Sequence, residues 1–418
     1  MKRSKKAAVL GLLTSFALVA AACGDDEDAT TATDGAAETT VAAATDTTEA
    51  STETTAAEST DTTEASTETT AAAGGEAVCP SNMVIQTDWW PELEHGGTYN
   101  LVGPDGTADA ENFIFSGPIQ EQYAVGGVET VEVRAGGDAV GFVPGSSLLA
   151  SDDDIIFAFI NVSDIMKEAG EVPMIAVAKT LDLDPQMIMW DPTQNPVATP
   201  EDIAAAGAQV LHFDGVAYID YMIAQGYMTA EQSNPSYGGA PDQWVAEGGN
   251  FFQQGFATNE VYKYENEIEW KDGAPADVDF YTVGDLGVPN YPAALTIRAD
   301  RLDELTPCLE VFVPAMQQAW VDFLAEPKPM MDALISIAET YDTYWTLSEG
   351  LNEAGIAVLE EEGIGANSPD GTYCSFDMER IQTLADIFGP IYEADGVVLV
   401  DDLTAVVTND FCAGAPGR

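Results

Sequence analysis

The sequence predicts an α/β fold of two lobes with a helical C-terminal part. Up to about residue 300, short apolar runs of strand length alternate with segments that have the spacing of helices. These units fall into two groups, and such alternation is typical of layered α/β domains. Beyond residue 300 the apolar residues recur every three or four positions, which indicates helices.

The first group contains four predicted strands. They are "MVIQT" at 83–87, "ETVEVRA" at 129–135, "DIIFAFIN" at 154–161 and "MIAVA" at 174–178. Each run is rich in branched or other apolar residues, and polar or turn-forming residues flank it, as is common for strands. We expect these runs to form the sheet of the first lobe.

The second group begins with a predicted helix at 199–207, with Thr199 as its N-cap and Pro200 in its first turn. A strand that enters a tight turn follows at 208–215, and a helix at 216–227 comes next. Strands that alternate with helices favour a largely parallel sheet. In such sheets the ligand lies in a crevice at the carboxyl ends of the strands.

The C-terminal third is predicted to be mostly helical. "TPCLEVFVPAMQQAWVDFLAEP" at 306–327 has a helix-start signal at Thr306 and Pro307. "PMMDALISIAETY" at 329–341 and "MERIQTLADIFGPIYEA" at 378–394 have the same apolar spacing.

The N-terminal residues predict export. A basic stretch and an apolar run end in small residues before Cys23, which predicts a signal peptide over 1–22. "LVAAAC" resembles a bacterial lipobox, which implies that Cys23 carries lipid and anchors the mature protein outside the cell; an ordinary secretory signal is the alternative. Residues 23–78 are rich in Thr, Ala and Glu and have no aromatic side chain, so we expect a disordered tether.

The folded part is strongly acidic. The chain has 71 Asp and Glu against 14 Lys and Arg, for a net charge of −57. Four of the basic residues precede residue 7 and 14 of the acidic ones lie in 24–78, which leaves 57 acidic and 10 basic residues. Such a surface repels nucleic acid and anionic lipid headgroups, so we expect no nucleic-acid partner. It also leaves few cations to pair with an anionic ligand such as nitrate or a sulfonate.

Four cysteines lie in the folded part: Cys79, Cys308, Cys374 and Cys412. In an exported chain an even number predicts two disulfides, with three possible pairings. Among these we expect Cys79–Cys412, which would tie the two ends together, and Cys308–Cys374, since each of these two precedes a predicted helix. The wide spacing is unlike that of a zinc site, and we expect neither a metal nor a cofactor.

Several motifs, in a fixed order along the chain, resemble those of a known family. They are "TDWWPELEHGGTY" at 87–99, "GFVPGSSLLAS" at 141–151, "VATPEDI" at 197–203, "FATNEVYKYE" at 256–265, "ALTIRADRLDE" at 294–304 and "FVPAMQQAWVDFLAEP" at 312–327. The chain resembles solute-binding proteins of ABC transporters over nearly all of 82–330. The nearest group binds pyrimidine precursors of thiamine, with sulfonate binders as relatives.

This resemblance implies a two-lobed, periplasmic-binding-protein-like fold of type II. Lobe 1 would comprise 79–176 with 293–418, and lobe 2 would comprise 177–292, with hinges near 172–179 and 292–298. It implies a monomer that captures a small solute between its lobes and delivers it to the membrane permease of an ABC importer. The lipid anchor would hold it at the extracytoplasmic face of the cell membrane.

The segment that opens the folded part is the first candidate site. A strand that ends at Asp88 would present Trp89 and Trp90 at the mouth of the cleft, and successive side chains point to opposite faces. One indole can therefore stack on a flat ligand while the other packs. Asp88 can accept a hydrogen bond from an exocyclic amine, His95 can donate or accept one, and Gly96 permits close backbone approach. The alternative is that both indoles fill the core and His95 caps the surface.

Further candidates lie at turns of the two lobes that would face the cleft. They are Ser146, Ser147, Phe213, Asp214, Asn259, Glu260 and Tyr281. Hydroxyl groups and free N–H groups at a helix start can hold a polar ligand atom, although N-capping explains the two serines equally well. Glu260 can pair with an amine or amidine-like edge or can be a solvated acid, and core packing is the alternative for Tyr281.

Four functions compete. A binding protein for a small heteroaromatic, pyrimidine-like solute fits the lipobox, the tether and the cleft motifs together. An organic sulfonate or another small molecule is an alternative ligand. A pyrimidine-synthesising branch of the same family uses a pyridoxal cofactor and carries closely spaced cysteines, a cluster that this sequence lacks. A structural surface lipoprotein would have no formed pocket. We expect no enzyme, since no catalytic triad, phosphate loop or metal-ligand spacing is evident.

Overall fold

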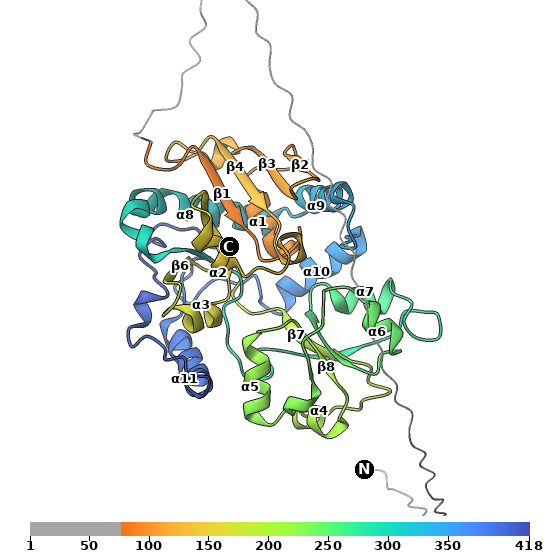
Figure 1. Ribbon diagram of the computed structural model, residues 1–418. Coiled ribbons are helices and arrows are strands. Elements are labelled where there is room, and N and C mark those ends of the chain that lie inside the picture. The colour runs from red at the N-terminus through yellow and green to blue at the C-terminus, as the bar shows by residue number, and fades with distance from the viewer. Residues whose placement is uncertain (1–76) are drawn as a thin grey trace, which may run out of the picture. The chain divides into compact units, whose positions relative to one another are not determined.

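The computed structural model describes residues 77–418. The predicted signal peptide, Cys23 and the tether up to residue 76 lie outside the described residues. Between residues 77 and 418, no helix is both long enough and apolar enough to span a membrane. This part of the chain contains two β-sheets with helices packed around them (Figure 1).

The larger sheet has seven strands in the order β2-β3-β4-β1-β5-β12-β6. The strands are β1 (Asn82–Gln86), β2 (Thr107–Asp109), β3 (Ile114–Pro118), β4 (Thr130–Arg134), β5 (Ile155–Ile160), β6 (Met174–Ala178) and β12 (Ala294–Arg298). The four strands predicted in the first group are confirmed as β1, β4, β5 and β6. Strand β12 joins this sheet only after the chain has built the second sheet.

The second sheet has five strands in the order β11-β7-β10-β8-β9. They are β7 (Gln186–Trp190), β8 (Val210–Leu211), β9 (Ser233–Asn234), β10 (Phe252–Phe256) and β11 (Asp279–Thr282). Two connections join the sheets, one from β6 to β7 and one from β11 to β12. Strand β6 continues to Ala178, so the expected lobe boundary at residue 176 falls inside a strand.

The expectation of largely parallel sheets is wrong. Strand β1 is parallel to β4 and β5, and β8 is parallel to β9 and β10, but the six other strand pairs are antiparallel. The β2-β3 hairpin adds an antiparallel edge, and β12 enters between β5 and β6 from the opposite direction. The apolar runs predict that a strand is buried, but they do not encode its direction, because a parallel strand and an antiparallel strand can be buried equally well.

The helices cover both sheets. They are α1 (Gly96–Tyr99), α2 (Gly145–Ser151), α3 (Val162–Glu168), α4 (Glu201–Ala206), α5 (Ala217–Gln225), α6 (Asp242–Ala246), α7 (Glu260–Asn266), α8 (Leu302–Ala325), α9 (Lys328–Tyr341), α10 (Glu349–Glu361) and α11 (Met378–Ala394). The alternation along β1 divides the core, since Met83 and Ile85 enter one apolar cluster and Val84 enters another.

Helix α8 begins earlier than predicted. It starts at Leu302, so Pro307 lies inside it rather than at its first turn. A proline inside a helix removes one backbone hydrogen bond. The helix is nevertheless maintained by tertiary packing, since Leu305, Cys308 and Leu309 are buried in the larger core.

The two disulfides pair differently from the expectation. The bonds are Cys79–Cys308 and Cys374–Cys412, not Cys79–Cys412 and Cys308–Cys374. Cys308 does not precede a helix but lies within α8, which packs against α1 and belongs to the same apolar cluster as β1. The first bond therefore joins the start of the folded part to α8, and the second closes the C-terminal segment onto the turn before α11.

Candidate functional site

The segment that follows β1 is buried and internally bonded. The imidazole of His95 is fully buried, with its Nε2 atom 2.7 Å from Oδ1 of Asp88 and its Nδ1 atom 3.2 Å from the carbonyl oxygen of Trp90. Nε2 also lies 3.7 Å from the carboxylate of Glu92. His95 is therefore not a surface cap. It ties the turn after β1 into one shape and leaves Asp88 partly exposed.

Strand β1 ends at Gln86 and not at Asp88 as expected, so both tryptophans lie in the bend that follows the strand, where their surroundings differ. Trp90 is 2% exposed and packs against Phe113 and Tyr341, with its indole N–H donating to Oδ1 of Asp138. Trp90 is thus a core residue, and its candidacy as a ligand contact is withdrawn. Trp89 is partly exposed and belongs to an aromatic cluster that both sheets contribute to.

The aromatic cluster is centred on Trp89. Its ring centroid lies 5.2 Å from that of Phe213, which follows β8, and 5.8 Å from that of Trp345, which lies between α9 and α10. Phe142 completes it at 6.3 Å. Gly239 lets the second sheet's loops approach closely, because an added methyl group there would lie 2.6 Å from the Trp89 ring. The indole therefore bridges segments attached to the two sheets.

Gly96 does not face a ligand. A methyl group on Gly96 would lie 2.2 Å from the ring of Phe323, and one on Gly97 would lie 2.2 Å from the ring of Trp320. Both partners belong to α8, so the glycine pair permits α1 to approach α8. The close backbone approach expected from the sequence is real, but it serves helix packing.

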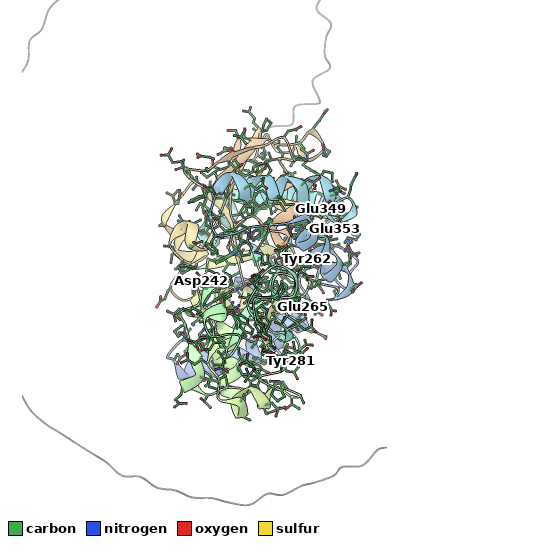
Figure 2. The ribbon with its side chains drawn as sticks, turned by 90° about the vertical axis from the view of Figure 1, so that its right-hand side faces the viewer. Asp242, Tyr262, Glu265, Tyr281, Glu349 and Glu353 are labelled. Carbon is green, nitrogen blue, oxygen red and sulfur yellow. A yellow bond between two sulfur atoms is a disulfide. The ribbon has the colours of Figure 1, made fainter. Side chains whose placement is uncertain are left out.

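Several other candidates lie apart from the cluster. Tyr281 packs on Trp190, with ring centroids 5.2 Å apart, and Figure 2 places it low on the second sheet, apart from Tyr262 and Glu349. Tyr281 is partly buried and lines neither of the two cavities described below. Asp214 is exposed, and Ser147 is exposed on α2, whereas Ser146 is buried at the start of that helix.

A cavity of about 200 Å³ adjoins the aromatic cluster. It is lined by Tyr237, Gly239, Pro241, Glu260, Lys263, Tyr264, Glu267, Ile268, Tyr344, Trp345 and Thr346. An apolar cavity of about 150 Å³ can hold benzene, so this one has room for a single substituted ring. Its walls come from α7 and the residues just after it, from the loop between β9 and α6, and from the loop before α10.

Glu260 is the predicted residue that lines this cavity. Its Oε2 atom accepts a hydrogen bond of 2.7 Å from the backbone N–H of Phe256, and burial raises the pKa of the carboxyl group. Lys263, one turn further along α7, places its ammonium group 4.4 Å above the centre of the Trp345 ring, and burial lowers its pKa. Asn259 is buried beside them, and its side-chain oxygen has no partner among the described residues.

Two more buried carboxyl groups lie within electrostatic reach. Burial raises the pKa of Glu92 well above its usual value, and the charges of Glu94, Asp88 and Glu260 raise it further. Burial likewise raises the pKa of Glu94, which accepts a hydrogen bond from the hydroxyl of Thr258 across the boundary between the two sheets' segments. The surroundings of the cavity are therefore rich in carboxyl groups and poor in cations.

Most residues of the cavity wall are not marked by any pattern in the sequence. Tyr344 and Trp345 lie in an irregular loop between two helices, where no periodicity marks them. Lys263 had a usable signal, since it is one of few lysines in an acidic chain and lies inside the quoted "TNEVYKYE" stretch. Tyr237 carries no local signal, because its position in the cavity depends on the loop that follows β9.

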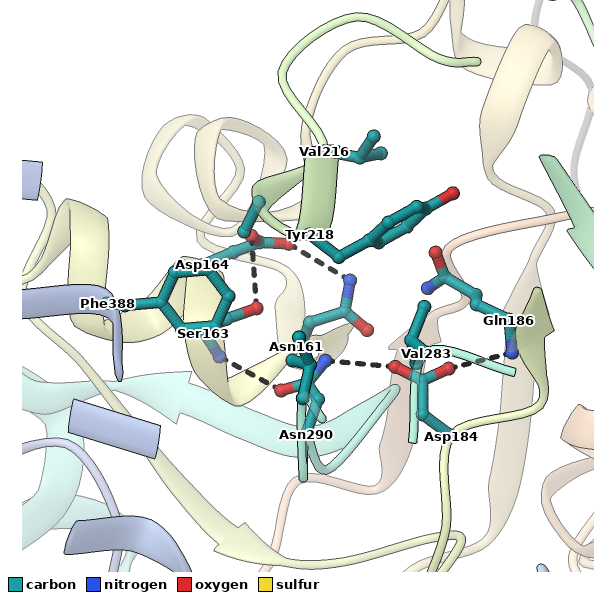
Figure 3. Close-up of a pocket in the computed structure, with 12 residues that line it drawn as sticks. Asn161, Ser163, Asp164, Asp184, Gln186, Val216, Tyr218, Val283, Asn290 and Phe388 are labelled. Carbon is teal, nitrogen blue, oxygen red and sulfur yellow. Dashed lines mark hydrogen bonds between the residues drawn. The ribbon is translucent and has the colours of Figure 1, made fainter. Parts of the chain in front are cut away.

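A second, smaller cavity of about 20 Å³ lies where the two inter-sheet connections meet. Figure 3 shows its polar network: Asn161 donates to Asp164 at 3.0 Å, and Asn290 donates to Asp184 at 3.1 Å. Asp184 also accepts from the backbone N–H of Gln186. This cavity has room for about one water molecule, so it is too small for a solute.

Asp184 should make stability depend on pH. Burial raises its pKa from 3.8 to about 6. The stabilisation from its protonation is complete below the unfolded pKa and is lost as the pH rises through the folded pKa. Asp184→Asn lacks this titration. The unfolding free energy of the wild type, relative to the variant, should therefore fall by about 2 kcal/mol from about pH 4.5 to 7.5, measured by urea unfolding. Parallel pH curves would contradict this assignment.

Comparisons with known proteins identify the fold. No family model matches the chain, and no curated protein matches its sequence. Among solved structures, the periplasmic aliphatic sulphonate-binding protein SsuA of Escherichia coli matches with a TM-score of 0.50 and 13% identity, over 78% of this chain and 92% of that one. The periplasmic nitrate-binding protein NrtA of Synechocystis PCC 6803 matches with a TM-score of 0.50 and 13% identity, over 80% and 88%. The chain thus has the expected periplasmic-binding-protein-like fold.

Proposed function

We propose that this protein is the lipid-anchored, extracytoplasmic substrate-binding protein of an ABC importer, and that it captures a small heteroaromatic solute and delivers it to the permease. The observation that carries the proposal is the junction around Trp89. Aromatic rings attached to both sheets meet there, next to a cavity with room for one ring. Flat rings gain from contact with indole and phenol faces beyond the area they bury.

The proposed division into lobes supports capture by closure. Lobe 1 comprises 79–176 with 293–418, and lobe 2 comprises 177–292. Only two connections join the sheets, and Asn290 in one donates to Asp184 in the other. In addition, Arg380 of α11 donates to the carbonyl oxygen of Pro289 at 2.8 Å. Two bonded connections of this kind suit a hinge that lets the lobes open and close.

The chemistry of the cavity favours a solute with an amine edge over an anion. Glu260 and the partly exposed Asp88 accept hydrogen bonds, and such bonds are strong when the acceptor is ionised. An anionic solute, such as an organic sulfonate, would meet one cation, Lys263, that carboxyl groups already surround. A pyrimidine-like ring with an exocyclic amine fits both the aromatic and the acidic walls.

The test uses protein purified without denaturation. Mass spectrometry of the released small molecules should identify one solute with a flat ring, and that solute should raise the melting temperature when it is added back. Small-angle scattering should then show a smaller radius of gyration for the saturated protein than for the protein freed of solute. Identical scattering curves, with no solute recovered and no thermal shift in a solute screen, would overturn the proposal.

A further inference from the structure

Very few of the Lys and Arg residues line the cavity. The chain has 14 Lys and Arg, of which four precede residue 7, so ten lie in the described part. Of these ten, Lys263 alone lines the cavity. Arg134, Lys271 and Arg298, among others, form ion pairs elsewhere. The positive charge available to a solute in this cavity is therefore one ammonium group.

Carboxyl groups, by contrast, are concentrated there. Glu92, Glu94 and Glu260 are 4%, 4% and 7% exposed, and each lies within electrostatic reach of at least one of the others. Glu267 also lines the cavity, at its exposed side. Three buried carboxyl groups around one ammonium group leave the site short of positive charge, and buried charges are stable only when they are paired.

The cavity also presents polar groups that have no partner. Tyr237 lines it and is 7% exposed, and its hydroxyl makes no hydrogen bond with any residue of 77–418. Glu260 uses one carboxylate oxygen for the backbone of Phe256, and the other accepts no bond from the described residues. An ionised carboxylate oxygen can only accept hydrogen bonds, and a phenol can donate or accept one, so both groups are open to a ligand with hydrogen-bond donors that enters the cavity.

The aromatic part of the lining is suited to a cation. The ammonium group of Lys263 already lies 4.4 Å above the Trp345 ring, so this aromatic face attracts positive charge within the protein itself. Tyr344 and Tyr237 contribute two more aromatic rings to the lining. A carboxylate on one side and aromatic faces on the other are the two features that recognise a planar organic cation.

We propose that the solute is an organic cation with N–H donors on a flat ring, of the amidinium type, whose charge pairs with Glu260. This rests on the proposed function and specifies the charge of the solute. One N–H group would donate to the free oxygen of Glu260, and the ring would lie against Tyr237 and Tyr344, since the ammonium group of Lys263 already lies over the Trp345 ring.

Three planar probes of nearly the same shape test the charge directly. Benzamidine carries a positive charge, benzamide is neutral, and benzoate is negative. Calorimetric titration of each into the full-length protein should give the order benzamidine, then benzamide, then benzoate, with at least about a tenfold gap between the first two. Equal affinities, tighter binding of benzoate, or no heat from benzamidine at roughly 10 mM would overturn the proposal.

A matched pair of variants separates the local contact from general charge. Glu260→Gln should weaken benzamidine binding by about tenfold and change benzamide binding little. Glu265→Gln removes the same charge from the same helix, but Glu265 does not line the cavity, so its effect should stay below about twofold. Equal losses in the two variants, with melting temperatures unchanged, would count against pairing with Glu260.

The charge proposal and the proposed function can fail separately. If mass spectrometry recovers a neutral or anionic solute that compacts the protein in scattering, the solute-binding function stands and the cation proposal is overturned. If mass spectrometry recovers no solute and none of the three probes binds, the solute-binding function is overturned as well. A recovered solute that carries a positive charge and binds less tightly to Glu260→Gln than to Glu265→Gln supports both.

Discussion

Removing the Cys79–Cys308 bridge, by replacing both cysteines with serine, is expected to lower the free energy of unfolding by about 5 kcal/mol. The bond joins residues 229 positions apart, so in the unfolded chain it closes a very long loop. Removing the bond releases this constraint and raises the entropy of the unfolded chain. The bridge also fixes the first residues of the folded part to α8, which is the longest helix among the described residues. Urea unfolding of the wild type and the double variant measures the difference.

The second disulfide provides the control. Cys374–Cys412 closes a segment of only 38 positions, so its removal by the same double replacement should cost about 4 kcal/mol, roughly 1–2 kcal/mol less than the first. Peptide mapping without reduction should link the peptides of Cys79 and Cys308. A peptide that links Cys79 to Cys412 would contradict the pairing, and a larger loss from the shorter loop would show that loop entropy does not dominate.

The cysteine pairing shows what one sequence leaves open. Four cysteines allow three pairings, and the choice among them depends on which helix packs under which strand. Cys308 was expected before a helix because Pro307 resembles a helix start. The helix in fact begins at Leu302 and presents Cys308 toward the first residues of the folded part. The local signal was outweighed by tertiary packing.

The strands illustrate the same division between local and long-range information. Continuous apolar runs such as 155–160 identify a buried strand because burial on both faces removes polar alternation. The short strand β2, "TAD", is polar and only partly buried, so no apolar pattern marks it. Its position depends on pairing with β3, which the sequence analysis did not predict. Strand direction likewise depends on the path of the connections.

The candidate site was partly predictable. The strand was expected to end at Asp88, whereas β1 ends at Gln86 and the two tryptophans lie in the bend after it. The alternation of side chains at a strand end nevertheless led to the prediction that one tryptophan would pack. The structure assigns that role to Trp90. Glu260 was predicted from the "TNE" motif, and it lines the cavity. The opposite wall, with Trp345, lies 85 positions further along the chain in a loop, and only the packing of α9 and α10 brings it there.

Trp90→Ala is expected to lower the stability of the fold, whereas Trp89→Ala is expected to weaken solute binding. Trp90 is 2% exposed in the larger core, so its truncation leaves a large cavity and should lower the free energy of unfolding by about 3–5 kcal/mol. The loss of its indole N–H would also leave Asp138 without a hydrogen bond of 2.5 Å. Urea unfolding measures this loss, and solute binding by the folded fraction should change little, because Trp90 does not line the cavity.

Trp89→Ala should instead keep the fold and weaken solute binding by about 1–3 kcal/mol, because the partly exposed indole, which does not itself line the cavity, packs on Trp345, which does, and on Phe213. Calorimetry with the recovered solute, or with benzamidine, gives the affinity, and urea unfolding of the same sample gives the stability. Trp89→Phe is the matched variant, since it keeps an aromatic face and should restore much of the binding. If Trp89→Ala binds the solute as tightly as the wild type, the aromatic cluster is only a contact between segments of the two sheets and takes no part in solute binding.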